Sequence, residues 1–137
     1  MQIQLLNVQY PKLEYNVSTI DPQVTNQLNL SFDYITIVRE GENNQFFDIV
    51  FNLHLTDKNQ LFSLKITAMA NFQTDEVIDA SFKNSDFVNV NAPAIAFPFL
   101  RTFVANFMLN TGYTPVIFPS YNFQTLAENK KQPKKVD

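Results

Sequence analysis

The side chains that could do chemistry are few and widely separated in this 137-residue chain. The single histidine, His54, lies in an alternating apolar stretch, and the nearest approach to a carboxylate cluster is Asp75, Glu76 and Asp79. Acid–base catalysis requires a buried pair of groups with shifted pKa values. These carboxylates instead lie in a polar stretch typical of a solvated loop or a helix start. Arg101 stands alone in an apolar segment, where we expect a structural hydrogen bond or ion pair.

The composition excludes several further kinds of site. The chain has no cysteine, which excludes disulfides, thiolate metal sites and cysteine nucleophiles. Its two glycines are too few for a glycine-rich phosphate loop. A lone histidine on the polar face of a strand does not indicate a catalytic or metal site. We therefore expect no enzyme activity, no metal and no cofactor.

Charge is distributed unevenly along the chain. Residues 1–127 carry 6 basic and 11 acidic side chains, whereas residues 128–137 carry four lysines and two acidic residues. The acidic body is unsuited to a phosphate backbone, so we expect no nucleic-acid partner. The short polar tail, 128–137, predicts a disordered basic segment. Without a signal peptide or ~18 consecutive apolar residues, we expect a cytoplasmic protein that is not embedded in a membrane.

Alternating apolar side chains predict strands in the first half of the chain. Residues 45–56 and 61–72 alternate with period two and are joined by the polar turn 57–60, which predicts an antiparallel hairpin. In residues 27–40 the apolar phase changes, and we expect a bulge near Asp33–Tyr34.

The opening segment also changes its apolar phase and is interrupted by Pro11, which favours an edge position in the sheet. With the three segments that follow it, this segment predicts a four-stranded antiparallel meander.

A long helix is predicted after a weakly periodic connection at residues 74–93. Pro98 fits the first turn of a helix, residues 99–109 contain no breaker, and Gly112 is placed to end it. Apolar side chains surround much of this helix, so it needs cover on more than one side. One sheet face supplies only part of that cover. An extended, proline-marked segment and a short closing helix at 122–131 follow.

The segment from residue 93 to residue 126 combines proline, glycine and aromatic residues in a specific order. The pattern consists of Pro93, Ile95, Phe97, Pro98, Phe99 and Arg101, followed by Gly112, Pro115, Pro119, Asn122, Phe123 and Leu126. This pattern resembles the SecB family of protein-export chaperones, and the resemblance covers roughly residues 1–127. It implies a single SecB-like domain of the α+β class, with a four-stranded antiparallel sheet, a long helix and a short C-terminal helix.

The resemblance also implies a function. SecB-like proteins bind unfolded polypeptides or preproteins without ATP, in apolar grooves between the sheet, the crossing connection and the C-terminal helix. Apolar and aromatic side chains suit this task because hydrophobic contact is non-directional. Here the groove residues would be Leu28, Leu30, Phe32, Phe82, Phe87, Val88, Val90, Phe118, Tyr121, Phe123 and Leu126, each of which is also compatible with ordinary core packing.

The family resemblance further implies a homotetramer built as a dimer of dimers, with Phe99, Phe103 and Phe107 at the oligomer interface. Two partnerships stay open. One is protein export with the SecA motor, although the tail is basic where export chaperones usually end in an acidic region. The other is a dedicated chaperone or adaptor for one partner, such as an antitoxin. An enzyme or small-ligand carrier is the third hypothesis, and the sequence supports it least.

Overall fold

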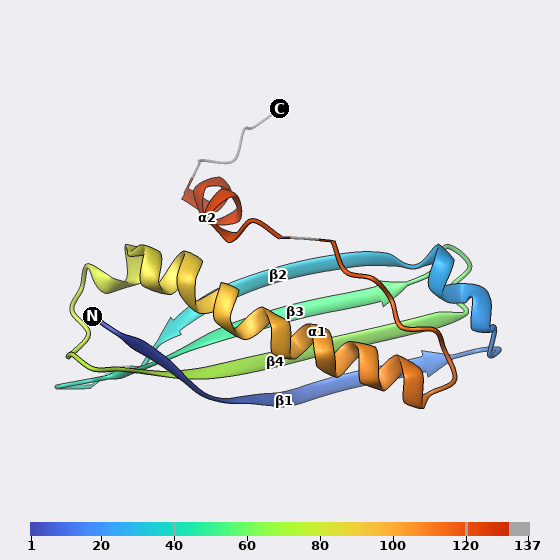
Figure 1. The fold of residues 1–137 in the computed structure, drawn as a ribbon, viewed down its shortest axis with the longest axis horizontal. Coiled ribbons are helices and arrows are strands. Elements are labelled where there is room, and N and C mark those ends of the chain that lie inside the picture. The colour runs from blue at the N-terminus through green and yellow to red at the C-terminus, as the bar shows by residue number, and fades with distance from the viewer. Residues whose placement is uncertain (40, 120, 132–137) are drawn as a thin grey trace.

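A computed structural model describes residues 1–39, 41–119 and 121–131. It has two layers, an antiparallel four-stranded sheet and a long helix that lies across one face of it (Figure 1). The strands and α-helices are β1 (Ile3–Val17), β2 (Asn29–Val38), β3 (Phe46–Thr56), β4 (Phe62–Thr74), α1 (Ala92–Asn110) and α2 (Phe123–Lys131). The predicted α+β fold is confirmed.

The strand order in the sheet is β1-β4-β3-β2. β2, β3 and β4 are consecutive neighbours, as predicted, but β1 pairs with β4, so the prediction of a simple meander is wrong for the first strand. The reason lies in the connection at residues 18–28, which includes the 3₁₀ turn Pro22–Gln27. Hairpin loops usually have 2–5 residues, whereas this longer connection carries the chain to the far edge (Figure 1).

Every second residue of β2 faces the core along the whole length of the strand. Its register with β3 has no shift, so the predicted bulge at Asp33–Tyr34 is wrong. Tyr34 is buried, while Ile35 and Ile37 lie on the open face of the sheet and are 49% and 43% exposed. Tyr34 takes the inward position because its hydroxyl donates a hydrogen bond to the backbone carbonyl of Asn89, at 2.8 Å.

β1 does contain the phase change that its sequence predicts. Its register with β4 shifts between Leu5 and Asn7 and again between Gln9 and Lys12. Pro11 lies within the second shift, where its missing N–H removes no regular ladder bond. β1 is an edge strand, as predicted.

α1 begins earlier than the sequence predicts. It starts at Ala92 directly after a π-helical turn, Phe87–Asn91, and Pro93 occupies the first turn. Pro98 lies inside the helix, so the prediction that it starts the helix is wrong. The preceding turn buries Ala96 and Phe97 against the sheet, and this burial compensates for the hydrogen bond that a proline removes.

The C-terminal end of α1 agrees with the prediction. Gly112 has φ of +101°, a left-handed conformation that favours glycine. The amide of Tyr113 donates to the carbonyl of Met108 at 2.9 Å, and the amide of Gly112 donates to Leu109 at 3.4 Å. This pair of bonds is the Schellman arrangement, which satisfies the last carbonyls of a helix.

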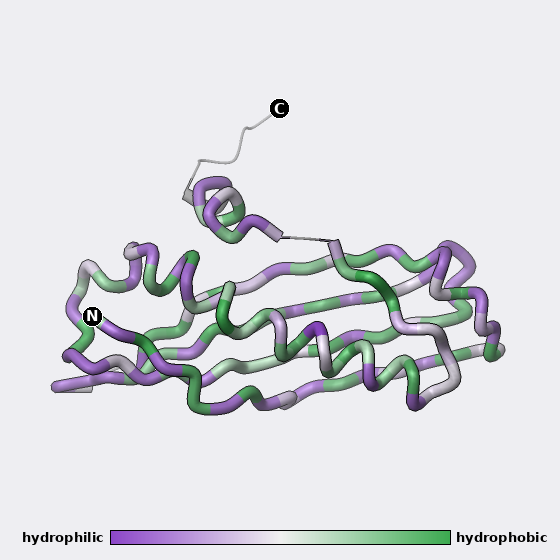
Figure 2. Tube along the Cα trace, viewed as in Figure 1, coloured by the Kyte–Doolittle hydropathy of each residue, from purple (hydrophilic) through white to green (hydrophobic). Residues whose placement is uncertain are grey.

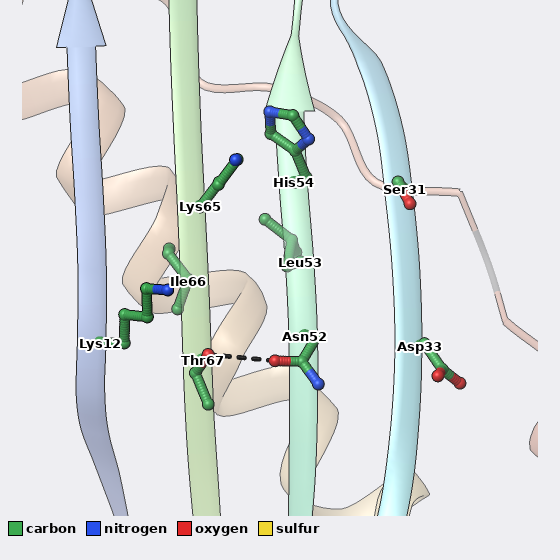
Figure 3. A pocket seen from close by; sticks show the side chains of 9 residues that line it. All are labelled: Lys12, Ser31, Asp33, Asn52, Leu53, His54, Lys65, Ile66 and Thr67. Carbon is green, nitrogen blue, oxygen red and sulfur yellow. Dashed lines mark hydrogen bonds between the residues drawn. The ribbon is translucent and has the colours of Figure 1, made fainter.

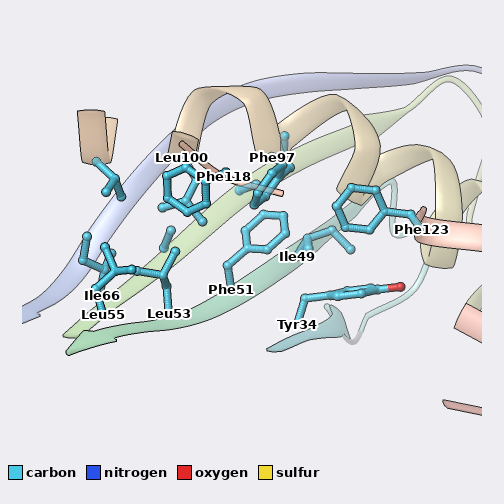
Figure 4. Close-up of a cluster of buried hydrophobic side chains, with 14 of the residues drawn as sticks. Tyr34, Ile49, Phe51, Leu53, Leu55, Ile66, Phe97, Leu100, Phe118 and Phe123 are labelled. Carbon is cyan, nitrogen blue, oxygen red and sulfur yellow. The ribbon is translucent and has the colours of Figure 1, made fainter. Parts of the chain in front are cut away.

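The core lies between α1 and the helix-facing side of the sheet (Figure 4). Inward side chains of β3 and β4 alternate with polar ones, and the hydropathy changes accordingly along the strands in Figure 2. The predicted inward rows are confirmed: Phe47, Ile49, Phe51, Leu53, Leu55, Phe62, Leu64, Ile66, Ala68, Ala70 and Phe72 are all buried.

A polar network crosses the open face of the sheet. The guanidinium of Arg39 donates to both carboxylate oxygens of Asp48, at 3.0 and 3.2 Å, and to the side-chain carbonyl of Asn71 at 3.2 Å. The Asn71 amide in turn donates to Asn7 on β1. The Arg39 guanidinium lies 5.6 Å from the ring centre of Phe46. Asp48 is only 6% exposed, so its charge depends on this arginine.

We predict that Arg39→Ala lowers the free energy of unfolding by about 1.5–3 kcal/mol, because it leaves a buried carboxylate without its charged donor. Urea denaturation followed by circular dichroism measures the change. Lys12→Ala is the matched control, since Lys12 and Glu14 form an exposed pair at 3.7 Å that contributes at most about 1 kcal/mol. Equal losses in the two variants would contradict the structural role of Arg39.

Candidate functional site

An aromatic cluster joins β2, α1 and the segment after α1. Phe97 is at its centre, buried at 5% exposure. Its ring centre lies 5.2 Å from those of Phe32 and Tyr121, 5.7 Å from that of Phe123 and 5.9 Å from that of Phe118, each in an edge-on arrangement. Edge-on ring pairs add about 0.5–1.5 kcal/mol beyond area burial. Figure 4 shows Phe118 and Phe123 beside Phe97 between the helix and the sheet.

The closing segment is attached to β2 by a stacked ring pair. Tyr121 and Phe32 lie 4.8 Å apart with an interplanar angle of 27°. Asn122 follows, and its side-chain oxygen accepts a hydrogen bond from the Thr125 amide at 3.2 Å, which caps the start of α2. Phe123 is 7% exposed and anchors the first turn of α2. The Asn-Phe pair of the motif therefore caps the helix with one residue and anchors it with the other.

The π-helical turn before α1 forms the third wall of this region. The Asn89 side-chain amide donates to the carbonyls of Lys83 and Ser85, both at 3.1 Å, and its own carbonyl accepts from Tyr34. π-turns are rare and are often found at functional sites. The side chains of β2 and the crossing connection are thereby fixed to each other.

A depression of about 290 Å³ lies where β2, the crossing connection and α2 meet. The sequence predicts a client groove between the same elements, but none of the residues that line this depression belongs to the predicted set. The lining residues are Tyr34, Ile35, Thr36, Lys83, Asn84, Asn89 and Ala127. Burial raises the pKa of Tyr34, and the nearby charge of Asp33 raises it further. Burial alone raises the pKa of Tyr121, so both phenols stay neutral at physiological pH.

The predicted groove residues fall into groups with different exposure. Four of them are buried core residues: Phe82, Val88, Phe118 and Phe123. Six are partly buried against that core: Leu28, Leu30, Phe32, Val90, Tyr121 and Leu126. Phe87 is 36% exposed. The aromatic cluster unites Phe32, Phe118, Tyr121 and Phe123, whereas Phe82 packs against Phe47 elsewhere in the core, at 5.2 Å.

The predicted interface residues of α1 differ in what they contact. Phe103 stacks on Tyr10 with ring centres 3.9 Å apart, and Phe107 meets Tyr15 edge-on at 5.2 Å. Both therefore pack partly against β1 of their own chain. Phe99 is 56% exposed and is available to another surface.

Within the described ranges, the residues that could do chemistry lie in separate places. Asp75 accepts from the Gln2 amide at 2.8 Å. The Asp79 carboxylate accepts hydrogen bonds from the hydroxyl and the backbone amide of Ser81. Both bonds lower the pKa of Asp79, and the bond from the hydroxyl has the larger effect. Within the described residues no three His, Cys, Asp or Glu side chains lie close enough to hold a metal. The exposed side chain of Arg101 forms no hydrogen bond or ion pair with another described residue, so the bond predicted for it is not seen within the described part of the chain.

A second depression, of about 240 Å³, lies on the open face of the sheet (Figure 3). His54 is on this face and lies 3.2 Å from the Ser63 hydroxyl. Thr67 donates to Asn52 at 3.0 Å. The remaining lining consists of charges of both signs, the hydroxyl of Ser31 and the apolar residues Leu53 and Ile66, a mixture typical of a solvated sheet face.

One segment, Phe87–Asn110, is long and apolar enough to cross a membrane by length and composition alone. The core helix of a water-soluble domain passes the same test. Here one side of the segment packs on the sheet, with Leu100, Val104 and Met108 fully buried.

A sheet of this order, with a long helix across it and a closing segment anchored by aromatic rings, is the architecture of a SecB-like subunit. The family model "Preprotein translocase subunit SecB" matches residues 5–134, and the chain belongs to the SecB family. This is a family of protein-export chaperones, not of enzymes.

Curated relatives and a solved structure agree with this assignment. A protein-export protein SecB of Rickettsia felis is 27% identical over 107 residues, 76% of this chain and 68% of the relative. The corresponding protein of Rickettsia africae is 24% identical over 91% of this chain and 80% of its own. A SecB-like chaperone of Mycobacterium tuberculosis, solved with a peptide from the HigA1 antitoxin, has a TM-score of 0.69 at 11% identity, covering 87% and 90% of the two chains. That structure has the same fold.

We predict that Phe97→Ala costs about 3–5 kcal/mol of unfolding free energy, the usual range for removing a buried phenylalanine. Because Phe97 contacts both Tyr121 and Phe123, amide hydrogen exchange should rise more in α2 than in the β3–β4 hairpin. Val77→Ala, at a 49% exposed position, is the control and should leave both rates unchanged. Uniform acceleration across the chain would show that Phe97 does not specifically hold α2.

Proposed function

We propose that this protein is an ATP-independent holdase that binds extended apolar segments of unfolded polypeptides or preproteins. The observation that carries the proposal is the partly exposed aromatic surface where β2, the crossing connection and α2 meet. Membership of the SecB family supports it. The proposed contact residues are the accessible members of the predicted set: Leu28, Leu30, Phe32, Phe87, Val90, Tyr121 and Leu126.

The geometry suits an extended client. β2 is an edge strand, and its outer edge pairs with no other strand in the described part of the chain. An extended peptide can hydrogen-bond along such an edge while alternate side chains enter neighbouring pockets. Burial of Phe118 and Phe123 gives this surface a rigid base, and the phenols of Tyr34 and Tyr121 on it are neutral.

Charge favours the same clients. The body of the chain is acidic, with 11 acidic against 6 basic side chains in residues 1–127. Opposite charge accelerates encounter with segments rich in lysine and arginine, and apolar contact then holds them. Binding of this kind requires no nucleotide.

We further propose that the protein works in the cytoplasm as a homotetramer, a dimer of dimers, with Phe99, Phe103 and Phe107 near the interface. The exposure of Phe99 supports this proposal. The predicted basic tail begins within α2, which continues to Lys131. Residues 132–137 lie outside the described part, so a disordered tail remains a prediction.

The alternative function is a dedicated chaperone for one partner such as an antitoxin. The observation that favours it is the shared fold with a chaperone solved with an antitoxin peptide. Binding of several unrelated unfolded clients would indicate a general holdase. Tight binding of only one partner would indicate a dedicated chaperone. Export through SecA is compatible with the first and is tested by adding SecA to a client complex.

The proposed assembly and client binding predict the native mass of the protein and of its client complex. Light scattering should give a tetramer of about 63 kDa from subunits of 15.8 kDa. An equimolar unfolded, non-aggregating preprotein should add the mass of one client. A monomer that binds none of several unfolded chains would contradict the proposed function.

The second prediction concerns the surface itself. The double variant Phe87→Ala with Tyr121→Ala should weaken client binding about tenfold or more, because two accessible rings of the surface are lost. Fluorescence anisotropy of a labelled unfolded client measures this. Ile20→Ala is the matched control, since Ile20 is 61% exposed and lies in the β1–β2 connection. Equal affinity of the double variant and the control would place the client elsewhere.

A further inference from the structure

The backbone of β2 directs half of its hydrogen-bonding groups away from the sheet. The Arg39 amide donates to the Phe46 carbonyl at 3.4 Å, which continues the ladder between β2 and β3 by one pair. Residues of an antiparallel ladder alternate between bonded and non-bonded pairs, so the odd-numbered residues of β2 bond to β3 and the even-numbered ones point outward. We call this outward row the β2 edge: Leu30, Phe32, Tyr34, Thr36 and Val38.

A side chain of β2 itself covers the centre of the β2 edge. The Asp33 carboxylate accepts a hydrogen bond from the backbone amide of Tyr34 at 2.7 Å. In Figure 3 this carboxylate points away from β3 and past the side of the sheet. Charged side chains on edge strands protect them against pairing with further strands. A strand added to β2 must therefore displace the carboxylate from the amide and accommodate its charge.

The two sides of the β2 edge offer different surroundings to an added strand. On the helix side lies the depression of about 290 Å³, lined by Tyr34, Ile35, Thr36, Lys83, Asn84, Asn89 and Ala127. On the open side, Ile35 and Ile37 are 49% and 43% exposed and follow Asp33 along the strand. Alternate side chains of an added strand would thus meet a mixed, partly polar depression on one side. On the other side they would meet a carboxylate followed by two apolar residues.

The charge of Asp33 decides between possible partners. β2 contains no lysine or arginine, so β2 of a second copy supplies no cation in any register. An unfolded client presents many different segments, and the edge can retain those that carry a cation at the right position. The partner that fits the β2 edge is therefore an extended client segment.

We propose that this client segment pairs antiparallel with the β2 edge and places a lysine or arginine opposite Asp33. Every strand pair of the sheet is antiparallel, and antiparallel pairing is slightly more stable than parallel pairing. The client residues two and four positions before the cation then lie opposite Ile35 and Ile37, where apolar side chains fit. The inference rests on the proposed holdase function and adds the direction, the register and a specificity-determining residue.

The geometry of the pairing explains the need for a cation. Because Asp33 bonds to β3 through its backbone, it forms a non-bonded pair with a strand on its other side. Such pairs bring their Cα atoms to about 4.5 Å and their side chains closest together. Opposite charges at facing positions stabilise a sheet, and like charges destabilise it. A client carbonyl replaces the carboxylate at the Tyr34 amide, and the client cation becomes the new partner of Asp33.

N-methylated peptides test the pairing itself. The probe is a fluorescein-labelled peptide, Thr-Val-Thr-Val-Thr-Lys-Thr, whose binding is measured by fluorescence anisotropy. Methylation of its third residue removes the N–H that faces the Thr36 carbonyl and should weaken binding about tenfold, because addition to an edge depends on main-chain hydrogen bonds. Methylation of its fourth residue is the matched control, since that N–H faces away from β2. Equal effects at the two positions would overturn the pairing.

Charge exchange tests the role of Asp33. The wild-type protein should bind the lysine peptide about three to ten times more tightly than the same peptide with glutamate in place of lysine. Asp33→Lys should reverse this preference. Glu14→Lys, on the other edge strand, changes the net charge equally and should retain the wild-type preference. An unchanged preference in Asp33→Lys, or an equal change in the control, would overturn the assignment of Asp33.

The outcomes separate this inference from the proposed function. A protein that binds unfolded clients but shows no methylation pattern, or does not bind the peptide, would overturn the edge pairing alone. Both signatures in a protein that binds no unfolded chain would support the edge pairing and contradict the holdase. Tighter binding of the reversed peptide, Thr-Lys-Thr-Val-Thr-Val-Thr, would overturn the antiparallel direction.

Discussion

A helix with apolar side chains on opposite sides constrains everything around it. One side of α1 is satisfied by the sheet through Leu100, Val104 and Met108, and the other side presents Phe99 and Leu109 to the surroundings. A single-layer sheet cannot enclose a helix, so the fold is complete only in part as one chain. In the proposed assembly, the requirement that stabilises the subunit would also direct packing between chains.

The ring of Phe97 links that helix to the surface proposed for clients. Phe97 holds Tyr121 and Phe123 against β2, and these rings position α2 beside the π-helical turn. The proposed client surface is therefore built on a core residue of α1 and not on a mobile loop. Its accessible rings can contact many sequences because apolar contact has little directional preference, while the buried rings beneath keep their positions.

Much of the fold could be predicted from the sequence because β3 and β4 alternate strictly, and their inward rows are buried as expected. Tyr34 and Ile35 could not be assigned so simply. Hydropathy favours the isoleucine as the inward residue, whereas the hydrogen bond from Tyr34 to Asn89 reverses that choice. The long connection after β1 was the available sign that β1 does not pair with β2.

The site was harder to predict than the fold. Proline is strongly associated with helix starts, so the sequence places the start of α1 at Pro98 and leaves out the turn before it. Phe97 lies in that turn, and its central position is therefore not predicted. The helical spacing of Pro93, Phe97 and Leu100 was the signal that could have identified it. Phe82 and Val88 are buried by tertiary packing, and the local sequence pattern around them does not predict this burial.

The position of β1 has a consequence for synthesis of the chain. Ile3 pairs with Thr74, so β1 leaves the ribosome well before its partner strand β4 is complete. Closing so long a loop is entropically expensive, and contacts of this range slow folding. The β2–β3 and β3–β4 hairpins can form as soon as each is synthesised. β1 stays unpaired until β4 is complete. A chaperone of this architecture would thus pass through an interval in which its own β1 segment is itself unfolded and without its partner strand.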